Sequence, residues 1–326
     1  MKCINRKLYR LLSIFLTTTT LLAFAGCGKS NLPLDFKINN DISVSALESR
    51  TYGFADNLAV TATDVNGKTG FTTEDDCAAG LFDVNNAAVL YANGIHDRMN
   101  PASLTKIMTA ICALKYGNLE DTILCSDNVT KLESGASTCG LSSGDRLTLE
   151  QALYCLMLPS ANDAAVAIAE HISGSVDEFC NLMNVEAKKI GATNSNFVNP
   201  HGLTNEEHYT TVYDLYLITN EAIHYPKFLE IIQTPSYKSS MLDSSGNEKP
   251  IDIKSSNKYH DGTYSAPDSV TVIGGKTGTT SAAGSCLALV TRDSKNNPYI
   301  SIILHASERS LVYEQMSKLL EEINKR

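Results

Sequence analysis

The chain has 326 residues, of which 43% are hydrophobic and 19% are charged. It can therefore bury a core of ordinary size, which excludes a disordered tail and a fibrous repeat. The formal net charge is −9, so the surface as a whole repels polyanions. Because nucleic-acid binding rests on clustered lysine and arginine, and the sequence has no basic stripe, we expect no nucleic-acid partner.

The first 26 residues predict an export signal. A basic start is followed by an apolar run at 11–25, which is too short for the roughly 20 residues that a membrane-spanning helix needs. The run ends in Ala23-Phe24-Ala25-Gly26-Cys27. This sequence resembles the bacterial lipoprotein signal, in which small residues precede a cysteine that becomes the lipid-modified first residue of the mature protein.

We therefore expect Cys27 to carry a lipid that anchors the exported chain at the outer face of the bacterial cytoplasmic membrane. Phe24 stands where that signal usually has Leu or another aliphatic residue. Ordinary signal-peptidase cleavage, an uncleaved anchor and an unpaired Cys27 thiol are the alternatives. No later segment is apolar enough to span a bilayer, so we expect the rest of the chain to lie outside the membrane.

Nine cysteines are present, and seven of them follow Cys27, so they cannot all pair. Three fall on apolar helical faces, where cysteine usually acts as a small hydrophobic residue: Cys112, Cys155 and Cys180. We expect buried thiols, and Cys125 with Cys139 is the only pair worth testing as a disulfide. The seven histidines show neither HxxxH spacing nor proximity to paired cysteines, so we expect no metal site.

Residues 27–77 are predicted to be a lipid-anchored tether followed by irregular structure, because they are rich in small polar residues with only short apolar runs. The domain is expected to begin at residue 78. The runs 79–84 and 89–92, with Asn85-Asn86-Ala87 between them, predict a β-hairpin. A helix should then begin at Pro101 with Asn100 as its cap, and its apolar face should join the core.

The middle of the chain is predicted to be helical. Two capping boxes place helix starts at Thr148 and Ser175, and these helices should stop at Pro159 and Gly191. Apolar periodicity predicts two more helices, at 163–172 and 212–223.

After residue 265 the pattern changes to strands, at 270–274, 286–291 and 299–305, and an amphipathic helix follows to residue 323. Strands from both ends of the chain that flank a helical middle predict an α+β domain over 78–326. Its antiparallel sheet would join the amino- and carboxyl-terminal segments and pack against the helices. We expect no second domain.

Ser103 and Lys106 lie three residues apart in the first turns of the helix predicted from Pro101. This spacing puts the hydroxyl and the amine on one face, where a nucleophile and its base can touch. The helix amino terminus also directs backbone N–H groups toward Ser103, which favours an alkoxide or oxyanion there. A second SxxK at 255–258 lies in a polar stretch without a helix signal, and we interpret it as an exposed loop.

Two further motifs follow. Ser160-Ala161-Asn162 comes directly after a predicted helix end, in a loop that can aim both polar side chains, and we interpret Asp163 as a helix cap. Lys276-Thr277-Gly278 comes at the end of the strand predicted at 270–274, where an extended backbone can bind a substrate as an added strand. A second copy, Lys68-Thr69-Gly70, opens no recognisable strand and is interpreted as a turn.

In this order and context, the three motifs resemble those of the penicilloyl serine transferases, which include penicillin-binding proteins and class A β-lactamases. The wider sequence looks like the D-alanyl-D-alanine carboxypeptidases of the low-molecular-weight penicillin-binding class, at 101–109, 160–164, 200–203 and 275–280. The resemblance runs from about residue 78 to the end. It implies a β-lactamase/transpeptidase-like fold, a serine peptidase activity and no cofactor.

Two features depart from these relatives. Class A β-lactamases carry a Glu-x-x-Leu-Asn loop that activates the deacylating water, and this loop is not found between Asn162 and Lys276, so we expect no efficient β-lactam hydrolysis. The low-molecular-weight class often carries a carboxyl-terminal β-rich domain and an amphipathic membrane helix. We expect the lipid on Cys27 to take the place of that anchor.

The resemblance implies a route through an acyl-enzyme. Ser103 would attack the carbonyl of the penultimate D-Ala of a peptidoglycan stem peptide, with Lys106 as its neutral base. Ser160 would relay the proton to the departing D-Ala, and Asn162 would hold the stem peptide and Lys106. Water would then release the shortened peptide, and β-lactams would act as covalent inhibitors.

The resemblance also implies the residues that bind the substrate, which are Lys276, Thr277, Gly278 and Thr279. Lys276 and the two threonine hydroxyls would hold the terminal carboxylate. The N–H groups of Ser103 and Thr279 would form the oxyanion hole.

Other interpretations stay open. His201 could line the cleft, but a histidine before glycine in a turn is as often structural, so we do not count it as catalytic. A wall-binding or β-lactam-sensing protein would acylate without turnover. A transpeptidase would pass the acyl group to an amine.

Overall fold

The computed structural model describes residues 55 and 57–325. The predicted signal at 1–26 and the predicted anchor Cys27 lie outside the described residues. Within the described part, no helix is both long enough and apolar enough to cross a membrane.

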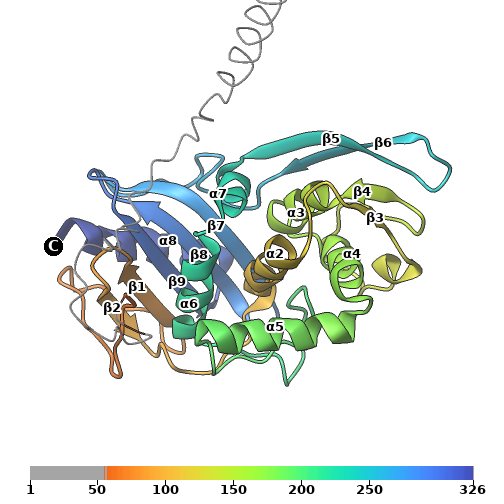
Figure 1. The fold of residues 1–326 in the computed structure, drawn as a ribbon. Coiled ribbons are helices and arrows are strands. Elements are labelled where there is room, and N and C mark those ends of the chain that lie inside the picture. Colours follow the sequence, from red (N-terminus) through yellow and green to blue (C-terminus); the bar gives the residue numbers. More distant parts are fainter. Residues whose placement is uncertain (1–54, 56, 326) are drawn as a thin grey trace, which may run out of the picture. The chain divides into compact units, whose positions relative to one another are not determined.

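Five antiparallel strands from the two ends of the described chain form the main sheet, in the order β2-β1-β9-β8-β7. The pairing of β1 with β9 joins the amino- and carboxyl-terminal segments, as predicted (Figure 1). The strands are β1 (Ala78–Asp83), β2 (Ala88–Asn93), β7 (Thr271–Thr280), β8 (Gly284–Arg292) and β9 (Pro298–Ala306).

Helices cover both faces of this sheet. Successive side chains of a strand point to opposite faces. On one face, Leu81 and Ile303 pack with Met316 of α8 (Arg309–Leu320). On the other face, Phe82 stacks on Tyr216 of α6 (Val212–Ala222), with ring centroids 4.1 Å apart.

The remaining helices lie beside the sheet, on the side of β7 (Figure 1). They are α2 (Thr105–Tyr116), α3 (Leu149–Met157), α4 (Asn162–Ser173), α5 (Val176–Ile190) and α7 (Pro226–Gln233). Short 3₁₀ turns complete the helical elements, at η1 (Ala102–Leu104), η2 (Asp127–Thr130) and η3 (Glu321–Lys325). The predicted α+β fold, with its sheet packed against a helical middle, is confirmed.

Local capping signals give the right helix ends. Thr148 and Gln151 form a complete capping box at the start of α3. The Ser175 hydroxyl accepts the N–H of the third helical residue at the start of α5. Gly174 and Gly191 end α4 and α5 with φ values of 80° and 95°, which L-residues with side chains rarely adopt.

The helix predicted to start at Pro101 begins later and differently. Ala102 has a φ of +47°, which is outside the right-handed helical region, so η1 precedes α2 and the α-helix starts at Thr105. Asn100 still accepts the Ala102 N–H through Oδ1, at 2.9 Å. Ser103 therefore lies in a tight 3₁₀ turn and not in the first turn of an α-helix.

The prediction of a single sheet is wrong. A second, four-stranded sheet has the order β3-β4-β5-β6. It was missed because two of its strands have only three residues and the other two carry mostly exposed polar side chains. The strands are β3 (Thr122–Leu124), β4 (Arg146–Thr148), β5 (Ser236–Leu242) and β6 (Glu248–Lys254).

Residues 57–77 are irregular, as predicted, yet they pack on the domain. The Ala59 N–H donates to the Tyr216 hydroxyl at 3.0 Å. The N–H groups of Lys68 and Thr69 donate to the carboxylate of Glu322, which is buried. This copy of Lys-Thr-Gly thus lies in a bend whose backbone N–H groups bind a carboxylate. Residues 57–77 therefore contact the domain that was predicted to begin at residue 78.

The seven cysteines of the described chain are free thiols. Six are buried and Cys139 is half-buried, as expected for small hydrophobic residues. The pair Cys125 and Cys139, which we singled out for testing, forms no disulfide. Burial raises the pKa of the Cys125 thiol to about 12, which leaves it protonated and unreactive at neutral pH.

A buried carboxylate ties α5 to α2. Glu186 has no exposed side-chain surface, and it accepts bonds from Lys115 at 2.5 Å, Lys189 at 2.6 Å and Tyr116 at 2.5 Å. Burial alone raises the pKa of Glu186, but the bonds from these three partners outweigh it and lower the pKa to about 2. The carboxylate form therefore stabilises the fold.

We expect Glu186→Gln to lower the free energy of unfolding by about 3 kcal/mol at pH 7. The folded pKa of about 2 lies below the ordinary value of 4.5, so this stabilisation is present above pH 4.5 and is lost as the pH falls toward 2. Urea unfolding at pH 7 and pH 3 measures it. Glu178→Gln, on the exposed side of the same helix, is the control and should cost less than about 0.5 kcal/mol. A difference that does not shrink at pH 3 would contradict this account.

Candidate active site

A buried lysine lies next to the predicted serine nucleophile. The Nζ of Lys106 is 3.0 Å from the Oγ of Ser103, 2.6 Å from the Oδ1 of Asn162 and 2.7 Å from the carbonyl oxygen of His201. Lys106 has no exposed surface, and all three of these partners are uncharged oxygens. Burial first, and then the charge of Lys276, lower the pKa of Lys106 well below its ordinary value. A neutral amine in this position can take the hydroxyl proton of Ser103.

The carbonyl of His201 is a contact that sequence reasoning missed. The sequence suggested a role only for the side chain of His201, and that role stayed open. The contact with Lys106 is instead made by the backbone oxygen of His201. Burial, together with the charge of Lys106 and with His208, lowers the pKa of His201 to about 3, so its ring is neutral. Only the wider sequence match at 200–203 pointed to this segment.

Ser160 has an unusual backbone and an unpaired hydroxyl. Its φ is +68°, and its Oγ is buried with no hydrogen-bond partner within the described chain. The flanking backbone holds it in place, because the Ala161 N–H donates to Cys155 and the Asn162 N–H donates to Ser137. A strained residue with a buried, unsatisfied hydroxyl is typical of a site that awaits a ligand group.

Asp163 is not the N-cap residue of α4, but its carboxylate does accept a first-turn N–H of that helix, from Ala164 at 2.9 Å. It is the second residue of α4, and its carboxylate accepts the N–H groups of Cys139 at 3.1 Å and Leu141 at 2.9 Å. It therefore clamps the loop before β4 onto the start of α4. These bonds hold the loop close to Asn162, the residue that precedes Asp163.

The Lys276-Thr277-Gly278 motif lies inside β7 and not at the end of a strand, because pairing with β8 extends β7 to Thr280. β7 is an edge strand of the main sheet, and it packs against η1. Lys276 is buried and its Nζ donates to the carbonyl of Thr277 at 2.8 Å. Burial, and then the charge of Arg309, lower the pKa of Lys276 to about 7.

Gly278 permits the close approach of β7 to the nucleophile. A Cβ at this position would lie 2.9 Å from the Ser103 nitrogen and 3.0 Å from the Ala102 Cβ. Any side chain would therefore push the strand away from η1. The Thr279 hydroxyl, on the next residue, donates to the Gly278 carbonyl at 2.7 Å.

The second SxxK at 255–258 is not the exposed loop that we predicted. Asn257 is buried, and the Ser256 Oγ lies 2.6 Å from the Thr277 Oγ1. This segment thus borders the Lys-Thr-Gly strand. It is not a second nucleophile, because Lys258 pairs with Asp261 at 2.9 Å and not with Ser255.

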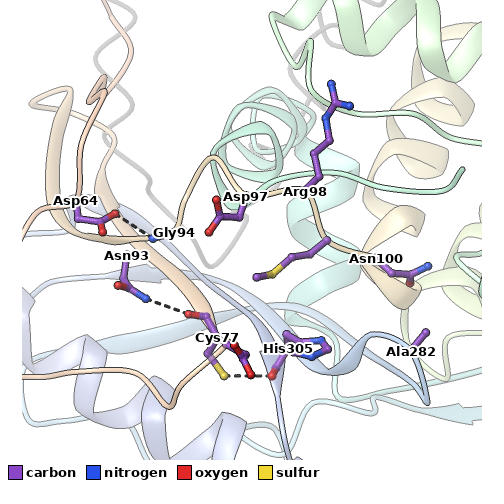
Figure 2. A pocket seen from close by; sticks show the side chains of 11 residues that line it. Asp64, Cys77, Asn93, Gly94, Asp97, Arg98, Asn100, Ala282 and His305 are labelled. Atoms are coloured by element: carbon purple, nitrogen blue, oxygen red, sulfur yellow. Dashed lines mark hydrogen bonds between the residues drawn. The ribbon is translucent and has the colours of Figure 1, made fainter. Parts of the chain in front are cut away.

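A cavity of about 660 Å³ adjoins this region. Its lining includes Asn100, three residues before the nucleophile, and Ala282 in the turn after β7 (Figure 2). Asp97 and Arg98 also line it, and the Arg98 guanidinium lies 4.6 Å from the centre of the Tyr209 ring. Among the described residues, no cluster of histidine, cysteine and acidic side chains could hold a metal ion.

Comparison with known proteins places this chain in a family. The family model for D-alanyl-D-alanine carboxypeptidases matches residues 73–308. D-alanyl-D-alanine carboxypeptidase DacF of Bacillus subtilis is 33% identical over 254 residues, which are 75% of this chain and 61% of DacF. The chain therefore spans about three-fifths of the length of this relative.

Solved structures agree with this similarity. The Streptomyces K15 DD-transpeptidase matches with a TM-score of 0.71 and 26% identity, over 78% of this chain and 100% of that one. Penicillin binding protein 5 from Haemophilus influenzae matches with a TM-score of 0.66 and 29% identity, over 75% of this chain and 69% of that one. The fold, the order of the motifs and the match over residues 73–308 establish that the chain belongs to the D-alanyl-D-alanine carboxypeptidase family.

Proposed function

We propose that the chain is a serine-type D-alanyl-D-alanine carboxypeptidase that removes the terminal D-Ala from peptidoglycan stem peptides. The observation that carries this proposal is the buried amine of Lys106, 3.0 Å from the Ser103 hydroxyl and without a carboxylate among its bonded partners. An amine in that setting is a base and not the cation of a salt bridge. Membership of the family supports the same activity.

The proposed reaction has two steps. The Ser103 oxygen attacks the carbonyl carbon of the penultimate D-Ala, its proton passes to Lys106, and the N–H groups of Ser103 and Thr279 bind the oxyanion. The peptide C–N bond then breaks, and the departing D-Ala nitrogen takes the proton through the Ser160 hydroxyl. Water attacks the ester, releases the shortened peptide and restores the Ser103 hydroxyl.

The free edge of β7 supports a substrate bound as an added strand. With the terminal carboxylate at Lys276 and Thr277, the scissile carbonyl reaches Ser103, beside which Gly278 lets the strand approach. The preceding residues of the stem peptide then run toward Ala282 and the cavity at the end of β7. A carboxylate beside Lys276 favours the charged form of that amine and raises its pKa above the value of about 7 that burial and Arg309 impose.

The test is to incubate the protein with a pentapeptide that ends in D-Ala-D-Ala and to measure free D-Ala. Release with a matching tetrapeptide product supports a carboxypeptidase. The similarity to a protein titled DD-transpeptidase makes transpeptidation the second candidate. A crosslinked product formed with an added amine would favour it, and acylation without release of a peptide product would favour a β-lactam sensor.

We expect penicillin to form a covalent adduct at Ser103, because the drug resembles D-Ala-D-Ala and the serine has a base 3.0 Å away. Ser103→Ala should abolish the adduct as measured by intact-mass spectrometry. Ser255→Ala, which alters the second SxxK, should keep it. An adduct on the Ser103→Ala variant would refute the assignment of the nucleophile.

Lys276→Ala should lower kcat/KM by roughly thirty- to a thousandfold, or about 2 to 4 kcal/mol, because it removes a charge-assisted contact to the substrate carboxylate. Lys68→Ala is the matched control, and it keeps the backbone N–H that binds Glu322. Steady-state release of D-Ala measures both.

A peptide with an amidated terminus provides the second arm of this test. Amidation should reduce the activity of the wild type strongly and of the Lys276→Ala variant only slightly, since the partner is already absent. Equal sensitivity of both enzymes would show that Lys276 does not bind the carboxylate. A large loss in Lys68→Ala would assign the role to the other copy.

We further propose that the chain is exported and held at the outer face of the bacterial cytoplasmic membrane by a lipid on Cys27. The small residues before Cys27 support lipid modification, and a wall substrate requires export. Cys27→Ala should abolish lipid labelling and impair removal of the signal, measured by fatty-acid labelling and by mapping the mature terminus. Unchanged labelling of the variant would refute this anchor.

A further inference from the structure

The segment between β6 and β7 provides a hydroxyl that touches the Lys-Thr-Gly strand. The Oγ of Ser256 lies 2.6 Å from the Oγ1 of Thr277, a normal distance for a hydrogen bond between two hydroxyls. Thr277 is buried to 7% exposure, so only a small part of its surface is left for a ligand. Ser256 is thus the neighbour that fixes how the Thr277 hydroxyl can turn.

The backbone of this segment is held from two sides. The Ser256 N–H donates to the carbonyl of Leu158, two residues before Ser160. The N–H of Lys258 donates to the Tyr313 hydroxyl at 3.0 Å. Ser256 therefore bridges the two walls of the cleft, with its backbone on the Ser160 side and its hydroxyl on the Thr277 side.

The number of available protons decides which of the two hydroxyls, Ser256 or Thr277, donates the hydrogen bond. Each hydroxyl has one proton, and one of the two protons is used in the bond between Ser256 and Thr277. If the Thr277 proton binds a carboxylate, Thr277 cannot also donate to Ser256. Ser256 must then donate to Thr277, and this bond turns the Thr277 O–H away from Ser256.

We propose that Ser256 is a positioning residue for recognition of the substrate's terminal carboxylate. Its hydroxyl donates to the Thr277 Oγ1, so that the Thr277 O–H is aimed at the carboxylate beside Lys276. This inference rests on the proposed function and adds a residue that none of the three motifs contains. Specificity for a free carboxylate over a neutral end group then depends on Ser256.

Ser256→Ala removes the hydroxyl but keeps the backbone bond to Leu158. We expect it to lower kcat/KM for the D-Ala-D-Ala peptide about tenfold, mainly through KM, because a bond to a charged group is weakened. The amidated peptide should lose less than about twofold, since it has no carboxylate to recognise. Ser256→Thr keeps a hydroxyl and should restore activity to within about threefold of the wild type.

Ser255→Ala is the matched control. Its hydroxyl accepts the Asn257 N–H within the same segment and, among the residues that the structure describes, makes no hydrogen bond to β7, so it reports disturbance of the loop alone. It should change kcat/KM by less than about twofold for either peptide. Penicillin and its methyl ester form a second pair of probes, one with a carboxylate and one without. Their acylation of the protein, followed by intact-mass spectrometry, replaces the peptide pair when turnover of the amidated peptide is too slow to measure.

The outcomes separate this inference from the proposed function. Equal losses on the carboxylate and neutral probes, or a loss in Ser255→Ala as large as in Ser256→Ala, would overturn the role of Ser256 while the peptidase activity stands. A wild type that releases no D-Ala would overturn the proposed function. The penicillin pair would then still test Ser256.

Discussion

The site depends on one buried amine. Lys106 has no exposed surface, and a lone ammonium in such a place would cost several kcal/mol unless it lost its proton. The oxygens of Ser103, Asn162 and His201 receive it, and they come from η1, from the start of α4 and from the loop before α6. Three separate parts of the chain must therefore be correctly placed for the Lys106 amine to be buried and still able to accept the proton of Ser103.

Backbone strain around this amine has a common location. Two positive-φ residues lie near a partner of Lys106 in the sequence. Ala102, with a φ of +47°, directly precedes Ser103, and Ser160, with a φ of +68°, lies two residues before Asn162. Gly202 has a φ of +84°, and a Cβ there would lie 1.8 Å from the Ala102 carbonyl oxygen. Such conformations cost about 1 to 3 kcal/mol each for residues other than glycine, and they persist only where the surrounding structure fixes them. The helices and the sheet supply that rigidity.

What the sequence predicted was decided by local rules. The helix ends at Gly174 and Gly191 follow from the left-handed conformation that glycine adopts, and the strand pairing at both ends of the chain follows from apolar periodicity. Local context also distinguished the motifs at 103–106 and 276–278 from their second copies at 255–258 and 68–70. Lys68 lies in a bend outside any strand, in line with the expectation that this copy opens no strand.

What the sequence could not predict was decided by tertiary contacts. A backbone carbonyl such as that of His201 has no signature in the residue type. The left-handed backbone at Ser160 is flanked by bonds to the carbonyls of Cys155 and Ser137, which no pattern in the sequence predicts. The polar segment around Ser256 has the composition of a surface loop. Its burial comes from strands that sequence reasoning missed, because β6 delivers it to the side of β7.

The two lysines of the cleft are coupled through their charges. The charge on Lys276 is one of the causes that lower the pKa of Lys106, so it favours a neutral amine beside Ser103. In the proposed mechanism a substrate carboxylate binds at Lys276 and offsets that charge. The repulsion that Lys106 experiences is then weaker, so its affinity for a proton rises when the proton of Ser103 has to be taken. Binding of the correct terminus thereby strengthens the base, which links recognition of the free carboxylate to the chemical step.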